Sequence, residues 1–225
     1  MTTLRVEFHC HTVFSKDSLT KPQDLVHAAR KIGLDRLIVT DHNSTGGAFA
    51  AKTIDPELVI IGEEIMTTQG ELLASFMTEE IPRHLTPMDT IHRLRDQGAF
   101  ISVSHPFDAQ RGWKIDELLE IIPHVDAIET FNSRCMRAEY NTMALAFAKE
   151  HNIPGTVGSD AHISYEVGRA ILVTPPFTNS DELRGVIQQA QSITRLSSPV
   201  IHFTSRYATI MKKMFPRLKP KNTDN

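Results

Sequence analysis

Two histidines near the N-terminus have the spacing of a metal-binding pair. His9 and His11 end a segment, residues 4–11, in which apolar and polar side chains alternate. Such alternation predicts a strand, and residues two apart on a strand point to the same face. Two neutral imidazoles that converge in this way suit a first-row transition metal. The pair is a weak signal by itself, so residues elsewhere in the chain must support a metal-binding role.

Further residues of metal-binding type recur at or just after the ends of later predicted strands. They are Asp41, His42, Glu63, Glu64, His105, Glu129, Asp160 and His162. Burying so many ionisable groups together is unfavourable unless cations accompany them. A mixed imidazole and carboxylate set without thiolates suits Mn, Zn or Fe, so we expect two to three divalent metal ions. Such ions polarise phosphoryl groups and generate hydroxide near neutral pH.

Predicted strands and helices alternate along the chain with short connections. The strands are expected at 4–10, 36–40, 58–61, 72–76, 100–104, 127–131, 154–157 and 169–173, and helices at 24–32, 86–98, 115–122, 137–151 and 181–190. Thr20 and Gln23 have the spacing of a capping box before the first helix. The alternation favours a largely parallel sheet closed, or nearly closed, into a β/α barrel, with an open doubly wound sheet as the alternative. In such a barrel the strand ends gather at one face, where catalytic residues meet.

Length and composition are those of an ordinary globular domain. Of the 225 residues, 40% are hydrophobic and 23% charged, and no apolar run is long enough to span a membrane. We predict one domain over residues 1–202 and a basic C-terminal tail over residues 203–225. Two cysteines and an N-terminus without an apolar signal region predict a cytoplasmic location.

The charge distribution bears on the kind of partner. The formal net charge of −3 argues against a broad nucleic-acid-binding face. The tail differs, because it carries six Lys or Arg and a single acid. A small phosphorylated substrate is therefore the expected partner, with nucleic acid as the alternative. The sequence carries no signal for an oligomeric state.

Five motifs, taken in order, resemble those of the polymerase and histidinol phosphatase (PHP) superfamily. They are His9-x-His11, Asp41-His42, Gly62-x-Glu64, Ser104-His105-Pro106 and Gly158-Ser159-Asp160-Ala161-His162. The resemblance covers roughly residues 4–195. It implies a distorted (β/α)7 TIM-like barrel with a trinuclear metal centre at the C-terminal strand ends. It also implies metal-dependent hydrolysis of phosphate esters.

The resemblance implies a ligand set for two metal positions that share a carboxylate. The first metal would be held by His9, His11, Glu64 and Asp160. Glu64 would bridge to a second metal, which His105 also binds. This bridging arrangement is what the family pattern places at these motif positions.

For the third metal position and one ligand of the second, the chain departs from the family pattern. Asp17, His42 and His162 would hold the third metal, although the glycine expected after the acidic residue is Ser18 here. Many relatives have a histidine where this sequence has Glu71. Either Glu71 substitutes as an oxygen ligand, which would shift preference toward Mn or Fe, or the second site is weaker.

Several other polar residues follow strands on the same expected face. Arg111 and Arg134 could clamp a phosphate by bidentate contacts, or they could be ordinary surface residues. Asn132 and Glu129 could touch the substrate or the site, or could make structural hydrogen bonds at a strand end. Asp41 is expected to orient a ligand histidine rather than to bind metal.

The expected chemistry is in-line attack of a metal-bridging hydroxide on the phosphorus of a small molecule or nucleotide. His105, His162 and Asp160 are the predicted catalytic residues, with a histidine assisting proton transfer. The alternative is a 3′–5′ or 5′–3′ exonuclease or oligonucleotide phosphodiesterase with the same metal chemistry. A metal-dependent amidohydrolase is disfavoured because no predicted strand ends in lysine, and a non-enzymatic metal-binding module because the ligand set is nearly intact.

Overall fold

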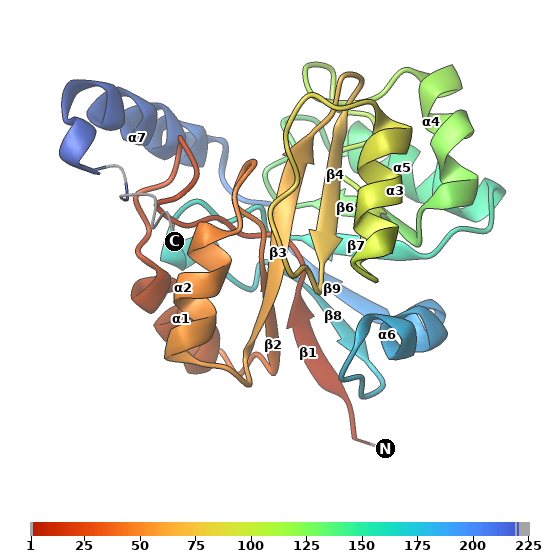
Figure 1. Ribbon diagram of the computed structural model, residues 1–225, viewed down its shortest axis with the longest axis horizontal. Helices are drawn as coiled ribbons and strands as arrows, with labels where there is room; N and C mark the ends of the chain where they lie inside the picture. Colours follow the sequence, from red (N-terminus) through yellow and green to blue (C-terminus); the bar gives the residue numbers. More distant parts are fainter. Residues whose placement is uncertain (1, 219, 221–225) are drawn as a thin grey trace.

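The computed structural model of the protein describes residues 2–218 and residue 220 (Figure 1). Its strands are β1 (Leu4–Glu7), β2 (Arg36–Val39), β3 (Val59–Met66), β4 (Glu71–Ser75), β5 (Phe100–Val103), β6 (Ala127–Asn132), β7 (Gly155–Gly158), β8 (Ala170–Thr174) and β9 (Gln191–Thr194). Its α-helices are α1 (Pro22–Lys31), α2 (Gly46–Ile54), α3 (Pro87–Asp96), α4 (Ile115–Ile121), α5 (Ala138–Glu150), α6 (Ser180–Val186) and α7 (His202–Met214).

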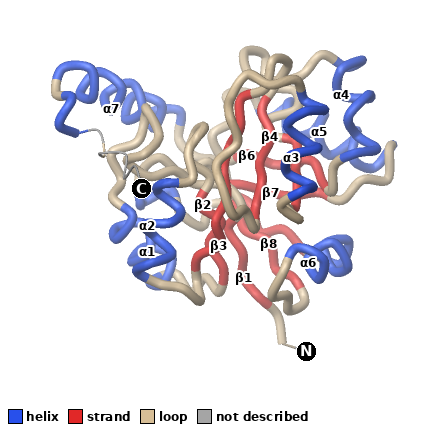
Figure 2. Tube along the Cα trace, viewed as in Figure 1, coloured by secondary structure: helices blue, strands red, loops and turns tan. Residues whose placement is uncertain are grey.

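The strands form a single curved sheet in the order β7-β6-β5-β4-β3-β2-β1-β8-β9. Strands β1 to β7 curl into a nearly closed barrel, with helices packed outside it (Figure 2). An isolated bridge between Cys10 and Ala161 joins the segments that follow β1 and β7. There the His11 backbone N–H donates to the Ala161 carbonyl at 2.8 Å. The expected TIM-like α/β barrel is confirmed.

The sheet is less parallel than expected. The strand β4 runs antiparallel to both β3 and β5, and β8 runs antiparallel to β1 and β9. The β3–β4 hairpin causes the first reversal, because two strands joined by a tight turn must run in opposite directions. The expectation of a largely parallel sheet was wrong for the pairings of β8 with β1 and β9.

The barrel interior is filled by apolar side chains from several strands. One buried cluster includes Val6, Ile38, Ile60, Phe100 and Val157, contributed by β1, β2, β3, β5 and β7. Two further clusters pack the outside of the sheet against the helices. Close packing of this core fixes the strands, and therefore the residues at their ends, relative to one another.

The capping box predicted before the first helix does not form, whereas a side chain caps helix α3. Helix α3 begins as expected, because the Thr86 hydroxyl accepts a hydrogen bond from the Asp89 N–H at 3.1 Å. Helix α1 has Lys21 at its N-cap and no side-chain cap. The Thr20 hydroxyl instead donates to the His162 carbonyl at 2.9 Å, so this side chain supports a loop of the candidate site.

The first part of the predicted tail is helical. Helix α7 lies beside the loop that joins β1 to α1, at one edge of the barrel (Figure 1). Residues 219 and 221–225 of the tail lie outside the described residues. Among the described residues, no helix has both the length and the hydropathy needed to cross a membrane.

Candidate metal centre

The structure brings all of the predicted metal ligands together at the C-terminal end of the barrel. They are His9, His11, Asp17, His42, Glu64, Glu71, His105, Asp160 and His162. All are buried except Asp17 and His42, which are partly exposed. Side chains far apart in the sequence therefore share one polar cluster, above an apolar barrel interior.

The first group is centred on the N-terminal histidine pair. The Nε2 atoms of His9 and His11 lie 3.1 Å apart, and both face the same carboxylates. Asp160 Oδ1 is 3.1 Å from His11 Nε2 and 3.6 Å from His9 Nε2. Glu64 Oε2 is 3.3 Å and 3.5 Å from the Nε2 atoms of His9 and His11. The donor atoms surround a common point, as the ligands of one ion do.

Glu64 connects this group to its neighbours. Its Oε1 lies 2.7 Å from His105 Nε2, and its Oε2 lies 2.9 Å from His42 Nδ1. Glu71 Oε2 is 3.7 Å from His105 Nε2. His42, Glu64 and Glu71 offer ligand atoms within 4.8 Å of one another. The two oxygens of Glu64 thus face different histidines, which a bridging carboxylate requires.

The third group lies nearest the solvent. Asp17 Oδ2 is 3.2 Å from His162 Nε2 and 3.6 Å from His42 Nε2. His11, His42 and His162 also offer ligand atoms within 4.8 Å of one another. The Asp17 side chain is 20% exposed, whereas that of Glu64 is fully buried.

The hydrogen bonding of the cluster fits divalent cations. Asp17 Oδ1, Glu64 Oε2 and Glu71 Oε2 are buried carboxylate oxygens without a hydrogen-bond donor. Leaving such acceptors unsatisfied is costly in a folded protein. The facing Nε2 atoms of His9 and His11 can share at most one proton. Cations would satisfy both the orphaned oxygens and the opposed nitrogens.

The electrostatics keep the central carboxylates ionised. Burial alone would raise the pKa of Glu64, but the charges of His9, His42 and His105 outweigh it and hold that pKa well below its usual range. Burial and the Arg111 charge lower the pKa of His105, yet Glu64 and Glu129 raise it to about 9. Facing carboxylates likewise raise the pKa values of His9 and His42, so protons and metal ions compete for the nitrogens of these three histidines.

Glu129 orients two of the histidines. Its Oε1 lies 2.9 Å from His9 Nδ1, and its Oε2 lies 3.2 Å from His105 Nδ1. With Nδ1 held in this way, the Nε2 atoms of both rings point into the cluster. Gly158 makes this possible, because a side chain at that position would overlap His9 and Glu129.

Asp41 acts on the cluster through a hydroxyl. Its Oδ1 accepts a hydrogen bond from Ser15 Oγ at 2.6 Å, and that hydroxyl oxygen lies 3.0 Å from His11 Nδ1. The backbone N–H of His42 also donates to Ser15 Oγ at 3.0 Å. Sequence reasoning missed Ser15, because a serine in a polar loop carries no signal of such a role.

Two residues of the cluster have unusual backbones. His105 and Asp160 have positive φ angles of 37° and 51°, a region that favours glycine. Such strain persists where the surrounding structure fixes it, and it is concentrated at functional sites. Both residues follow a buried strand closely, and the strain turns their side chains into the cluster.

Solved structures of other proteins share this fold. A two-domain protein from Bacteroides vulgatus, containing a predicted PHP-like metal-dependent phosphoesterase, superposes with a TM-score of 0.71 at 20% identity, over 86% of this chain and 65% of that one. The lesion-specific endonuclease PfuEndoQ from Pyrococcus furiosus superposes with a TM-score of 0.64 at 16% identity, over 88% of this chain and 60% of that one. The chain therefore spans less than two thirds of either structure.

Sequence comparison identifies the family. The uncharacterized protein MJ0417 of Methanocaldococcus jannaschii is 37% identical over 177 residues, which is 75% of this chain and 70% of that protein. The model of the PHP-associated family matches residues 138–192. The chain belongs to the PHP superfamily. The resemblance found in the five motifs is thereby confirmed.

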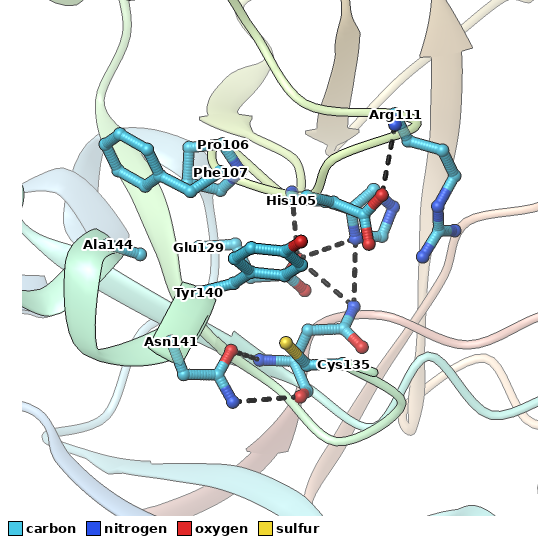
Figure 3. Close-up of a pocket in the computed structure, with 11 residues that line it drawn as sticks. His105, Pro106, Phe107, Arg111, Glu129, Cys135, Tyr140, Asn141 and Ala144 are labelled. Atoms are coloured by element: carbon cyan, nitrogen blue, oxygen red, sulfur yellow. Dashed lines mark hydrogen bonds and ion pairs between the residues drawn. The ribbon is translucent and has the colours of Figure 1, made fainter. Parts of the chain in front are cut away.

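Two of the residues predicted to bind substrate lie next to the cluster of predicted metal ligands. Arg111 Nη1 is 3.7 Å from Asp160 Oδ2, and its side chain is 35% exposed beside His105 (Figure 3). Asn132 Nδ2 lies 3.2 Å from Glu129 Oε2 and 3.4 Å from Asp160 Oδ2. Arg111 is partly exposed there, whereas Asn132 is buried, and substrate binding by these two residues stays a prediction.

Arg134 lies differently. Its guanidinium is buried, with Nε 3.4 Å from Glu166 Oε1 and Nη2 donating to the Ile201 carbonyl and the Ser205 hydroxyl. These contacts give Arg134 a structural role between the loop after β7 and helix α7. A phosphate-binding role for this residue stays a prediction.

A small cavity opens beside the cluster of predicted metal ligands (Figure 3). It measures about 20 Å³, and its lining includes His105, Glu129, Asn132, Cys135 and Tyr140. A volume of this size holds a water molecule rather than a substrate. This cavity alone is therefore too small to hold a substrate.

Proposed function

We propose that this PHP protein is a metal-dependent phosphoesterase that hydrolyses phosphate esters of a small molecule or nucleotide. It would use two to three divalent ions, Mn, Zn or Fe. The observation that carries the proposal is Glu64, a fully buried carboxylate whose oxygens face His9, His42 and His105 while Oε2 lacks a hydrogen-bond donor. A carboxylate in that position is explained by ions on both sides of it.

The ligand assignment follows the three groups. His9, His11, Glu64 and Asp160 would hold one ion. Glu64 would be shared with a second ion held also by His105 and Glu71. Asp17, His42 and His162 would hold a third. Divalent ions bound there would supply Lewis-acid polarisation of the phosphoryl group and activation of water.

The chain's own residues then position the substrate and handle protons. Arg111 would place a positive charge at the open face, where it can neutralise charge on the phosphoryl oxygens. His162 Nδ1 lies 2.8 Å from the Asp160 carbonyl, which can only accept, so Nδ1 carries the proton and Nε2 presents a lone pair. His105, His162 and Asp160 remain the proposed catalytic residues, because each would present a nitrogen or carboxylate oxygen to an ion that activates water.

A nuclease with the same centre is the second candidate. The structural neighbour PfuEndoQ is an endonuclease, and exposed cations on α7 and just beyond it, Arg206, Lys213 and Arg217, lie in a chain of net negative charge. Cations along one element can contact nucleic-acid phosphates. The small-substrate function is favoured because a formal net charge of −3 argues against a broad basic face.

Phosphate release by Mn-loaded protein tests the proposal. The substrates are nucleoside monophosphates, nucleoside 3′,5′-bisphosphates, histidinol phosphate, sugar phosphates and a short oligonucleotide. We expect turnover of one class, lost in a folded Asp160→Asn variant. Turnover of the oligonucleotide alone would favour the nuclease. Equal release by the native protein and the variant would overturn the proposal.

A further inference from the structure

Helix α7 carries a buried lysine toward the metal centre. Lys212 is 3% exposed, and lysine is seldom buried to this degree without partners. Its ammonium donates hydrogen bonds to the backbone carbonyls of Val13 and Ser15. These acceptors belong to the loop between β1 and α1, nearly 200 positions away in the sequence.

The loop held by Lys212 presents ligands of the third group. Ser15 Oγ lies 3.0 Å from His11 Nδ1 and accepts a hydrogen bond from the backbone N–H of His42, also at 3.0 Å. Asp17 comes two residues later and faces His42 and His162. The carbonyls that Lys212 binds are therefore close, along the backbone, to the carboxylate of the third group.

The other end of α7 is connected to His162. Arg134 donates to the Ile201 carbonyl and the Ser205 hydroxyl, at the beginning of the helix. Arg134 also pairs with Glu166, whose Oε2 accepts a hydrogen bond from the backbone N–H of His162 at 3.0 Å. A helix rises 1.5 Å per residue, so the anchors at Ile201 and Lys212 are roughly 16 Å apart. The helix thus spans the loops that carry Asp17 and His162.

The docking of α7 depends on these polar anchors. Its outer side chains Phe203, Tyr207, Ile210 and Met214 are between 54% and 67% exposed. Within the helix, only Ala208 and Lys212 are buried. With so little apolar burial, the charged hydrogen bonds of Lys212 hold the second half of the helix and the loop to each other.

We propose that Lys212 is a positioning residue for the third metal position. It holds residues 13–18 so that Asp17 meets His42 and His162. The inference rests on the proposed metal centre. It adds that a helix outside the barrel, within the predicted basic tail, completes that centre.

The test compares two adjacent lysines. Lys212→Met removes the ammonium and keeps an unbranched side chain of similar length, while Lys213→Met is the matched control because Lys213 is exposed. Each protein is loaded with Mn²⁺. The affinity of the protein for Mn²⁺ and the number of ions bound per folded chain are then measured. We expect Lys212→Met to lower the affinity for the most weakly bound ion about tenfold or more, in the range found for residues that orient ligands. Lys213→Met should match the native protein.

Further variants separate this inference from the proposed function. Asp17→Asn should weaken the same ion, and adding Lys212→Met to it should cause little further loss because both act on one position. Lys212→Arg, which keeps a cationic donor, should restore part of the affinity. Weakening by Asp17→Asn with native binding in Lys212→Met would overturn the inference alone. Native binding in both His9→Ala and Asp17→Asn would overturn the metal centre itself.

A second measurement covers the case in which Lys212→Met does not fold. Hydrogen exchange of the native protein should show slower exchange at residues 13–18 when Mn²⁺ is bound, and slower exchange in α7 with it. Lys212→Arg should uncouple the two in part, whereas Lys213→Met should not. Protection of the loop without any change in α7 would contradict the proposed role.

Discussion

The first and third groups of the metal centre are built in different ways. Glu64 lies on β3, His9 and His11 follow β1 within four residues, and all three are completely buried. Asp17 lies on a loop, is 20% exposed, and depends on contacts from a helix outside the barrel. Strands fixed by a packed core position ligands more rigidly than a loop does. We therefore expect the first group to hold its ion more tightly than the third group does.

The largest effect is expected at Glu64, the carboxylate that connects the first group to its neighbours. Glu64→Gln keeps the size of the side chain but removes the charge that faces three histidines. We expect loss of more than one bound ion and a fall in kcat/KM of about a thousandfold, roughly 4 kcal/mol of transition-state stabilisation. Metal content and steady-state kinetics on the same preparation measure both. Full activity with a native ion count would break the comparison at its centre.

The orienting carboxylate tests the barrel side alone. Glu129→Gln weakens the hold on the Nδ1 atoms of His9 and His105 and leaves the loop of Asp17 untouched. Changes of this kind lower metal affinity about 10- to 100-fold. We expect the tightest ion to be weakened most, as measured by competition with a chelator. If only the weakest ion were affected, the two groups would not be independent.

The loop side should respond more mildly. Asp17→Asn is expected to remove or weaken one ion about tenfold, while the ions held by the barrel strands remain. Binding isotherms with Mn²⁺ would show one weakened step among native ones. A simultaneous loss of every step would mean that the third position supports the others.

The pH dependence of the metal-free protein should sharpen the comparison within β3. Glu63 is buried beside Glu64 but faces no histidine group, and burial raises its pKa to about 8. The folded state therefore binds this proton more tightly than the unfolded state, and stability falls as pH rises from about 4.5 to 8, by at most about 1.4 kcal/mol per pH unit. Denaturant unfolding of the native protein and of Glu63→Gln across this range measures the effect. The variant should have a smaller slope, and an unchanged slope would contradict the assignment.

Much of the centre could be predicted from local pattern. The alternation in residues 4–11 predicted that His9 and His11 lie together, and they do, although β1 ends at Glu7 and both histidines follow it. A barrel brings strand ends to one face. The position of Glu64 relative to its strand was less predictable, because β3 continues to Met66 by pairing with β4. The ligand still points inward, since the alternation of side chains along a strand does not depend on where the strand ends.

The supporting residues could not be predicted, because their partners are distant in sequence. Ser15 and Lys212 meet across 197 positions, and two adjacent lysines on a helix are typical of a solvated surface. Arg134 follows a strand as a phosphate-binding residue would, yet its partner Glu166 comes from a short 3-10 turn that carries no motif. Contacts of this kind arise from tertiary packing rather than from periodicity.

The most direct test of the metal centre is the number of divalent ions bound by the native protein. Mass spectrometry under native conditions, after loading with Mn²⁺ and removal of excess metal, counts them for each chain. We predict two to three ions in the native protein and fewer in Glu64→Gln. A folded native protein that binds no ion would contradict the proposed centre.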